Sequence, residues 1–139
     1  MIVVDASVVV TALADDGDDG DRVRSRLRGE RLAAPYLIDV EVASAWRRLA
    51  AANDLDDRRA ALAFDDLRAL RLERVPHALL LTRCWELRHN LTIYDAAYVA
   101  LAELMATSLL TGDKKLAAAP GIRCTIKALG VVTIDMPKQ

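Results

Sequence analysis

The feature of this sequence that most constrains its fold is a series of short, mostly apolar runs separated by segments with helical periodicity. The runs lack the polar–apolar alternation of a half-exposed strand, so they predict strands that are buried on both faces. These predicted strands are residues 1–4, 31–34, 72–75, 107–111 and 131–134. Strands that alternate with helices predict an α/β fold: a short parallel sheet of about five strands, flanked by helices on both faces.

The segments between the runs predict the covering helices. Periodicity and capping residues place them at residues 7–14, 22–28, 37–52, 56–70, 77–88 and 92–105, with a short helix after residue 113. An acidic stretch at residues 15–21 is expected to be a loop. The 139 residues contain no repeat or linker, so we expect one domain over residues 1–139.

Charge and cysteine content exclude several classes of protein. A net charge of −1 excludes a polycation that binds nucleic acid over its whole surface, although it allows a local basic groove. Two cysteines cannot build a disulfide framework or an all-cysteine zinc site. The N-terminus has no basic region, and no uncharged apolar stretch reaches membrane-spanning length. We therefore expect a cytoplasmic protein with no membrane partner.

Four acidic residues are placed where a parallel sheet binds its ligands. Asp5 and Asp113 follow the first and fourth predicted strands, and Glu41 and Asp95 interrupt apolar helical patterns. Ligands of such sheets bind at the carboxyl ends of the strands, so these side chains are expected to converge there. Each also has a structural interpretation: Asp5, Asp95 and Asp113 suit helix capping, and Glu41 suits a helix rim. Asp39 is interpreted as a surface or capping residue.

Carboxylates that converge at one edge of a sheet indicate a site for a cation. Two of them about 4 Å apart repel by ~4 kcal/mol at an effective dielectric of 20, so a cation or bound protons must compensate. Ligands that are all oxygen favour Mg²⁺ or Mn²⁺ over zinc. Such a cation polarises a phosphoryl oxygen and activates water. The pattern therefore indicates metal-assisted hydrolysis of a phosphodiester.

The same acids stand in motifs that resemble those of PIN-domain ribonucleases. The similar segments are residues 3–7 (VVDAS), 39–43 (DVEVA), 94–102 (YDAAYVALA) and 110–116 (LTGDKKL). Their order, their spacing and the total length agree with the family over essentially the whole chain. No single motif is specific, but the four in order are.

A lone PIN domain of this size most resembles VapC, the toxin of bacterial toxin–antitoxin pairs. The resemblance implies a Mg²⁺-dependent endoribonuclease, for which Mn²⁺ substitutes. It also implies an RNA substrate, a VapB-type antitoxin partner, and a homodimer that joins a toxin–antitoxin hetero-oligomer.

The resemblance also implies roles for individual residues. Asp5 and Asp95 are the direct metal ligands, Glu41 acts through bound water or supports the ligands, and Asp113 completes the acidic pocket. Thr111, with Ser7, supports and orients the carboxylates. Some PIN domains have a further acid where this chain has Leu116, which leaves open whether one or two metal ions bind.

Other α/β proteins with acidic sites fit this sequence less well. A response-regulator receiver needs an acidic pair after its first strand, and a haloacid-dehalogenase-type phosphatase needs Asp-x-Asp; this chain has Asp5-Ala6-Ser7. His77 and His89 are interpreted as surface or capping residues rather than a metal-free ribonuclease pair. A non-catalytic binding module and another metal-dependent phosphoesterase stay open as alternatives.

Arginines near the predicted site are candidates for RNA contacts, although each also suits a solvated position. They are Arg22, Arg24, Arg47 and Arg48.

Overall fold

The protein is described here from a computed structural model that places residues 1–130. Five parallel strands form one sheet in the order β3-β2-β1-β4-β5. They are β1 (Ile2–Val4), β2 (Leu32–Pro35), β3 (Leu72–Val75), β4 (Leu109–Thr111) and β5 (Ile126–Ala128). The sequence predicted the first four and missed β5, while its predicted strand at 131–134 lies outside the described residues.

Helices connect the strands and begin close to the predicted positions. They are α1 (Ala6–Ala14), α2 (Asp18–Leu27), α3 (Ile38–Ala51), α4 (Asp57–Ala69), α5 (Leu81–Glu86) and α6 (Ile93–Leu104), with 3₁₀ turns η1 (His77–Leu80) and η2 (Leu116–Ala118). Asp56 and Thr92 cap α4 and α6 with their side chains.

Two helix predictions were wrong in detail. The segment 77–88 is not one helix: η1 follows Pro76, and the short α5 ends at Glu86. The acidic stretch is not all loop either, because Asp18, Asp19 and Asp21 form the first turn of α2. Acids are favourable there, since the helix dipole presents partial positive charge at its N-terminus.

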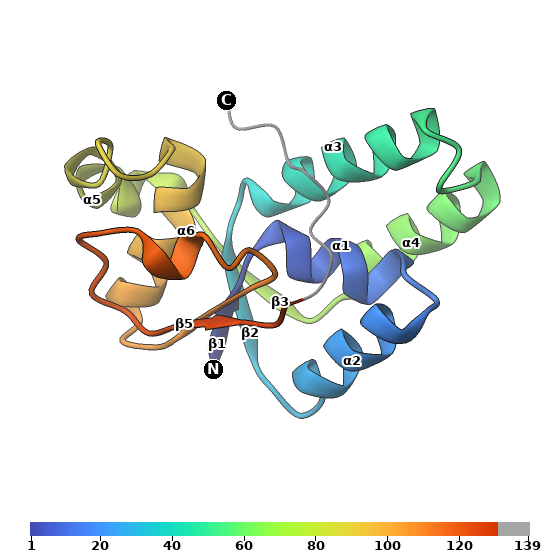
Figure 1. Ribbon diagram of the computed structural model, residues 1–139, viewed down its shortest axis with the longest axis horizontal. Coiled ribbons are helices and arrows are strands. Elements are labelled where there is room, and N and C mark those ends of the chain that lie inside the picture. Colours follow the sequence, from blue (N-terminus) through green and yellow to red (C-terminus); the bar gives the residue numbers. More distant parts are fainter. Residues whose placement is uncertain (131–139) are drawn as a thin grey trace.

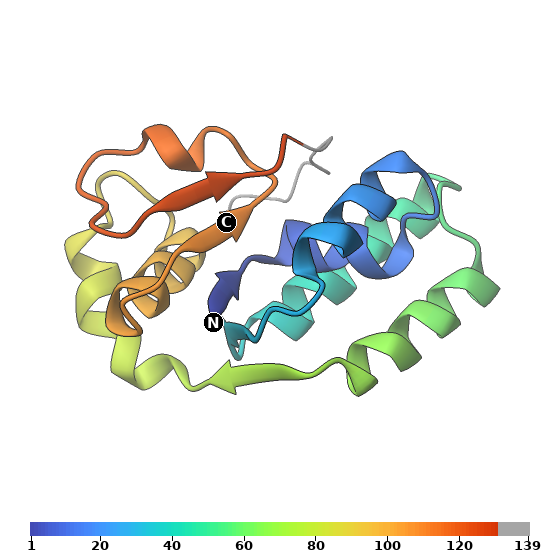
Figure 2. The same ribbon diagram turned by 90° about the horizontal axis from the view of Figure 1, so that it is seen from below.

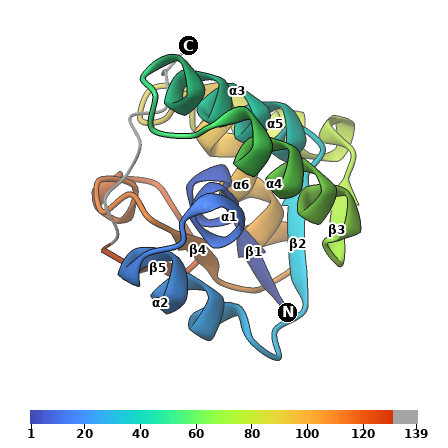
Figure 3. The same ribbon diagram turned by 90° about the vertical axis from the view of Figure 1, so that its right-hand side faces the viewer.

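The sheet lies between two groups of helices, as predicted. α6 packs against β1, β2 and β4 on one face, with α5 beside it. α1 packs on the other face, and α2, α3 and α4 pack against α1. Figure 2 shows the strands passing between these groups, and Figure 3 looks onto α1, α3 and α4. Across residues 1–130, no helix is long and apolar enough to cross a bilayer.

The core explains why β1 is central. Its residues Ile2, Val3 and Val4 are buried, and so are Leu109 and Leu110 on the neighbouring β4. β1 pairs with β2 on one side and with β4 on the other. Any side chain that follows β1 therefore emerges at the middle of the carboxyl edge, next to the end of β4.

Candidate functional site

Asp5 directly follows β1 and is held from three directions. Its Oδ1 accepts a hydrogen bond from Ser7 Oγ at 2.6 Å and from the Val8 backbone N–H at 3.2 Å. Its Oδ2 accepts a hydrogen bond from Thr111 Oγ1, at the end of β4. Asp5 is thus the N-cap of α1, as its structural interpretation predicted, and it is also tied across the sheet.

Backbone groups fix the direction of both hydroxyls. The Gly112 N–H donates to Ser7 Oγ at 3.0 Å, and the Asp113 N–H donates to Thr111 Oγ1 at 3.0 Å. Because each hydroxyl oxygen accepts from the backbone, its single hydrogen is available for Asp5. Thr111 has no exposed surface, so this arrangement is internal. The orienting roles expected for Thr111 and Ser7 are consistent with these contacts.

Glu41 reaches the same region from the first turn of α3. Its Oε1 accepts a hydrogen bond of 2.6 Å from the hydroxyl of Tyr98 on α6. Tyr98 is 2% exposed, whereas Glu41 is half-buried. Sequence reasoning missed Tyr98, although its position three residues after Asp95 places both on one face of α6.

Asp95 lies in the first turn of α6, where its backbone N–H donates to Thr92 Oγ1 at 3.1 Å. The predicted capping by Thr92 is therefore present. The negative charge of Asp95 also raises the pKa of both Asp5 and Glu41. Its charge thus acts on both of the other acids.

Burial raises the pKa of Asp5 to about 6, against the hydrogen bonds from Ser7, Thr111 and Val8 that lower it. Burial likewise raises the pKa of Glu41 to about 7, with the Tyr98 bond lowering it and the charges of Asp95 and Asp5 raising it. The charge of Asp95 therefore disfavours ionisation of Asp5 and Glu41, and the charge of Asp5 disfavours ionisation of Glu41. Such coupled, desolvated acids are typical of functional sites.

Asp113 is placed differently from the other three acids. Its Oδ1 accepts a hydrogen bond from the Lys115 N–H at 2.9 Å, which closes a turn. The N-cap of η2 is Lys115, so the expected helix capping by Asp113 was wrong in detail. It is not among the charges that raise the pKa of Asp5 or Glu41. The link of Asp113 to the site runs through its backbone, which orients Thr111.

The acids are coupled but are not packed into a preformed cage. Within residues 1–130, no three His, Cys, Asp or Glu side chains are grouped closely enough to hold a metal ion. A hydrated Mg²⁺ does not need such a group, because it commonly takes only one or two carboxylates and keeps several waters.

Asp39, His77 and His89 were expected to be surface or capping residues, and their contacts agree with that expectation. Asp39 forms a two-point ion pair with Arg74, at 2.7 and 2.9 Å. His77 Nε2 accepts a hydrogen bond from the Leu37 N–H at 2.8 Å, next to the start of α3, and His89 is exposed.

Two of the arginines suggested for RNA also make contacts within the protein. Arg22 pairs with Asp19, and Arg24 pairs with Asp21 while donating to the carbonyl oxygens of Ala12 and Asp15. Arg47 is exposed on α3, and Arg48 is half-buried.

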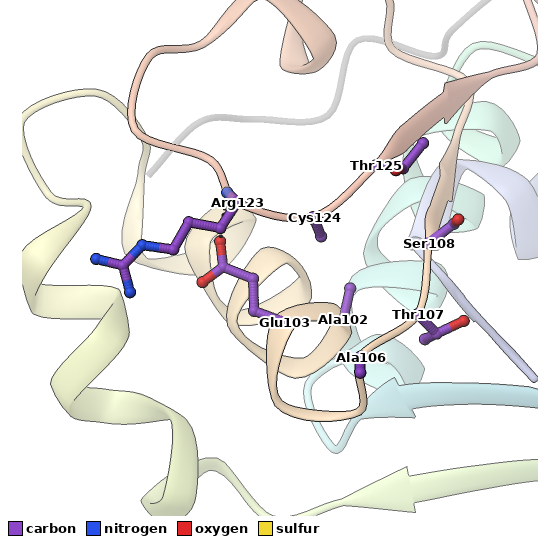
Figure 4. Close-up of a pocket in the computed structure, with 8 residues that line it drawn as sticks. All are labelled: Ala102, Glu103, Ala106, Thr107, Ser108, Arg123, Cys124 and Thr125. Atoms are coloured by element: carbon purple, nitrogen blue, oxygen red, sulfur yellow. Dashed lines mark hydrogen bonds between the residues drawn. The ribbon is translucent and has the colours of Figure 1, made fainter.

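An open hollow of about 650 Å³ lies at the opposite end of the sheet. Figure 4 shows its lining, which includes Ser108 and Thr125 just before β4 and β5. Its single acid, Glu103, accepts hydrogen bonds from Arg83 at 2.7 and 3.2 Å and from the Arg123 N–H at 2.8 Å. The carboxylate of Glu103 is therefore already paired, and it lies at the opposite edge of the sheet from Asp5, Glu41 and Asp95.

Comparison with known proteins gives consistent results. Residues 2–122 match the PIN domain family. The sequence is 46% identical to Ribonuclease VapC1 of Mycobacterium tuberculosis over 126 residues, which cover 90% of this chain and 95% of that protein. The fold is similar to that of M. tuberculosis VapC20, a sarcin-ricin loop cleaving toxin, with TM-score 0.65, 17% identity and coverage of 88% and 97%. It is also similar to VapBC2 from Rickettsia felis bound to a DNA fragment from their promoter, with TM-score 0.65, 15% identity and coverage of 92% and 98%.

The raised pKa of Glu41 predicts that removing its charge stabilises the metal-free protein. With a folded pKa of about 7 against an ordinary value of 4.5, the native state binds this proton more tightly than the unfolded chain does. The resulting stability is full below about pH 4.5 and is lost as the pH rises through about 7. We expect Glu41→Gln to unfold with a free energy higher by on the order of 2 kcal/mol at about pH 8, and no higher at about pH 4.

Urea unfolding in EDTA across this pH range measures the difference. The matched control is Glu73→Gln, because Glu73 is exposed on β3. A Glu41→Gln variant that is less stable than the parent protein at pH 8 would show that the carboxylate is favourably placed without a cation.

Proposed function

Because this chain belongs to the PIN domain family and is an RNA-cleaving hydrolase of the VapC group, we propose that it hydrolyses RNA with a divalent cation held by its coupled acids. We propose Mg²⁺, with Mn²⁺ as a substitute. The observation that carries the proposal is the set of Asp5, Glu41 and Asp95, whose charges oppose one another at the carboxyl edge of the sheet. A cation there would offset the burial and the neighbouring negative charges that raise the pKa values of Asp5 and Glu41.

The donor chemistry fits such a cation. The charged groups that act on one another here are the carboxylates of Asp5, Glu41 and Asp95, and carboxylate oxygens are ligands that Mg²⁺ and Mn²⁺ prefer. We propose Asp5 and Asp95 as the direct ligands. When bound, the cation would polarise a phosphoryl oxygen and lower the pKa of a water molecule.

The chain's own residues prepare that chemistry. Ser7 and Thr111 hold Asp5 with both hydroxyl hydrogens directed at it, so the carboxylate keeps one orientation. Glu41, bonded to Tyr98 through one carboxylate oxygen, is proposed to act through a water molecule bound by the cation. We propose that Asp113 contributes through its backbone and its negative charge at the rim of the pocket, rather than as a ligand.

This proposal predicts that RNA cleavage requires both the cation and the acids. Cleavage is expected with Mg²⁺ or Mn²⁺, to stop in EDTA, and to return when the cation is restored. Asp95→Asn removes a proposed ligand, so it should lower kcat/KM by more than ~100-fold. The measurement is the initial rate on a fluorescently labelled RNA over a series of cation concentrations.

Asp39→Asn is the matched control, because Asp39 lies on α3 near Glu41 but pairs with Arg74. It should cut at the parental rate. Cleavage that survives EDTA would contradict the metal-dependent reaction, and an Asp95→Asn variant with parental activity would remove Asp95 from the site.

We further propose that a VapB-like antitoxin binds this chain, supported by the likeness to VapBC2. We also propose that the chain forms a homodimer, which associates with the antitoxin into a hetero-oligomer. Exposed apolar side chains at η1 and α5 are suited to contact a second copy: Leu79 is 72% exposed, Leu81 54% and Trp85 62%. Leu81 and Trp85 are one helical turn apart, so they share a face of α5.

The dimer proposal predicts that Trp85→Glu separates the subunits, since it places a charge in an apolar contact. Light scattering at tens of micromolar should give a dimer for the parent chain and a monomer for the variant. Leu62→Glu is the control, because Leu62 is similarly exposed but lies on α4, across the sheet from α5. A monomeric parent chain or a dimeric Trp85→Glu variant would contradict the proposal.

A further inference from the structure

The hydroxyl of Tyr98 is the buried polar group at the site that has no role in the proposed chemistry. α6 is otherwise apolar around it, with Ala96, Ala97, Val99 and Ala100 all buried. A phenol in such a place costs free energy unless its hydroxyl finds a partner. The partner is Glu41 Oε1 at 2.6 Å, which comes from α3, 57 residues away in the chain.

The position of Tyr98 on α6 determines which side of this helix the Glu41 carboxylate lies on. Tyr98 and Asp95 are three residues apart, so they lie one turn apart on the same face of the helix. From this face of α6, the Tyr98 hydroxyl donates its hydrogen bond to the Glu41 carboxylate. Glu41 is thereby held on the side of α6 that carries Asp95.

Tyr98 acts in one chemical form throughout. Burial, and then the negative charge of Glu41, raise the pKa of Tyr98 well above its ordinary value. The phenol is therefore always a donor, and Glu41 Oε1 is always the acceptor. Hydrogen bonds to a carboxylate at this distance are short and strong, so the contact restrains the carboxylate as well as solvating it.

We propose that Tyr98 is a positioning residue that holds the Glu41 carboxylate toward the cation bound by Asp5 and Asp95, so that Glu41 contributes to cation affinity. This inference rests on the proposed function, and it adds a residue that never touches the cation or the RNA. A positioning role differs from a purely structural one in one respect: the effect of Tyr98 on cation binding must depend on Glu41.

A double-mutant cycle on the full chain tests this dependence. The Mn²⁺ dissociation constant, measured by electron paramagnetic resonance, is compared among the parent, Tyr98→Phe, Glu41→Gln and the double variant. We expect Tyr98→Phe to weaken Mn²⁺ binding by about 10-fold, the size typical of groups that orient a metal site. In the Glu41→Gln background the same change should have almost no effect, because the carboxylate it positions is gone.

Thr107→Val is the control for the loss of a hydroxyl donor far from the site. Thr107 Oγ1 donates a 2.6 Å hydrogen bond to the Met1 carbonyl oxygen at the opposite end of the sheet. This variant should melt at a lower temperature but bind Mn²⁺ like the parent. Tyr98→Phe keeps the aromatic ring in place, and circular dichroism melting of each variant confirms that the folded protein is being compared.

The outcomes separate the two proposals. If Tyr98→Phe binds Mn²⁺ like the parent, or loses equal affinity with and without Glu41, Tyr98 does not act through Glu41 and the inference is wrong while the proposed function stands. If the parent does not bind Mn²⁺, or if Asp5→Asn leaves binding unchanged, the proposed function fails and the inference fails with it.

Discussion

The site depends on one arrangement, the burial of the Asp5 carboxylate at the junction of β1 and β4. Two hydroxyls and a backbone N–H donate hydrogen bonds to this carboxylate, and the backbone after β4 fixes the direction of both hydroxyls. This requires β4 to be next to β1, which the strand order provides. The bonds lower the pKa of Asp5, but burial raises it by more. The fold therefore holds a carboxylate in position at a cost in stability.

Two further acids increase that cost. Glu41 and Asp95 come from α3 and α6, which follow β2 and η1–α5 in the chain and reach the same edge of the sheet. A domain that is stable by only ~5–15 kcal/mol tolerates such repulsion when a ligand of opposite charge offsets it during function. Tyr98 and Thr111 are neutral and buried, so they hold the acids without cancelling the negative charge that the proposed cation would neutralise.

Much of this architecture follows from the sequence, and the exceptions have physical reasons. The strand at residues 72–75 and the caps at Asp56 and Thr92 were predicted because short runs and capping side chains are local signals. β5 was missed because Lys127 interrupts its three residues, whose pairing with β4 decides their structure. The segment 77–88 was predicted as one helix because periodicity does not distinguish a 3₁₀ turn from the first turn of an α-helix.

For the acidic residues too, local sequence signals predicted some features, and contacts between distant parts of the chain decided the others. Asp5, Glu41 and Asp95 could be proposed from strand ends, interrupted apolar patterns and motif resemblance. The side-chain direction of Asp113 depends on a turn closed by Lys115, and the role of Tyr98 depends on a contact between distant helices. In the sequence, Tyr98 is indistinguishable from an ordinary core aromatic residue.

The most direct test of the account is a crystal structure of the full chain with Mn²⁺, in which anomalous scattering locates the ion. The account predicts one ion at the carboxyl edge of the sheet, with oxygens of Asp5 and Asp95 about 2.1 Å away and the Glu41 carboxylate still bonded to Tyr98. An ion bound elsewhere, such as at Glu103 in the hollow at the amino edge, with none near Asp5 in protein that still cuts RNA, would contradict it.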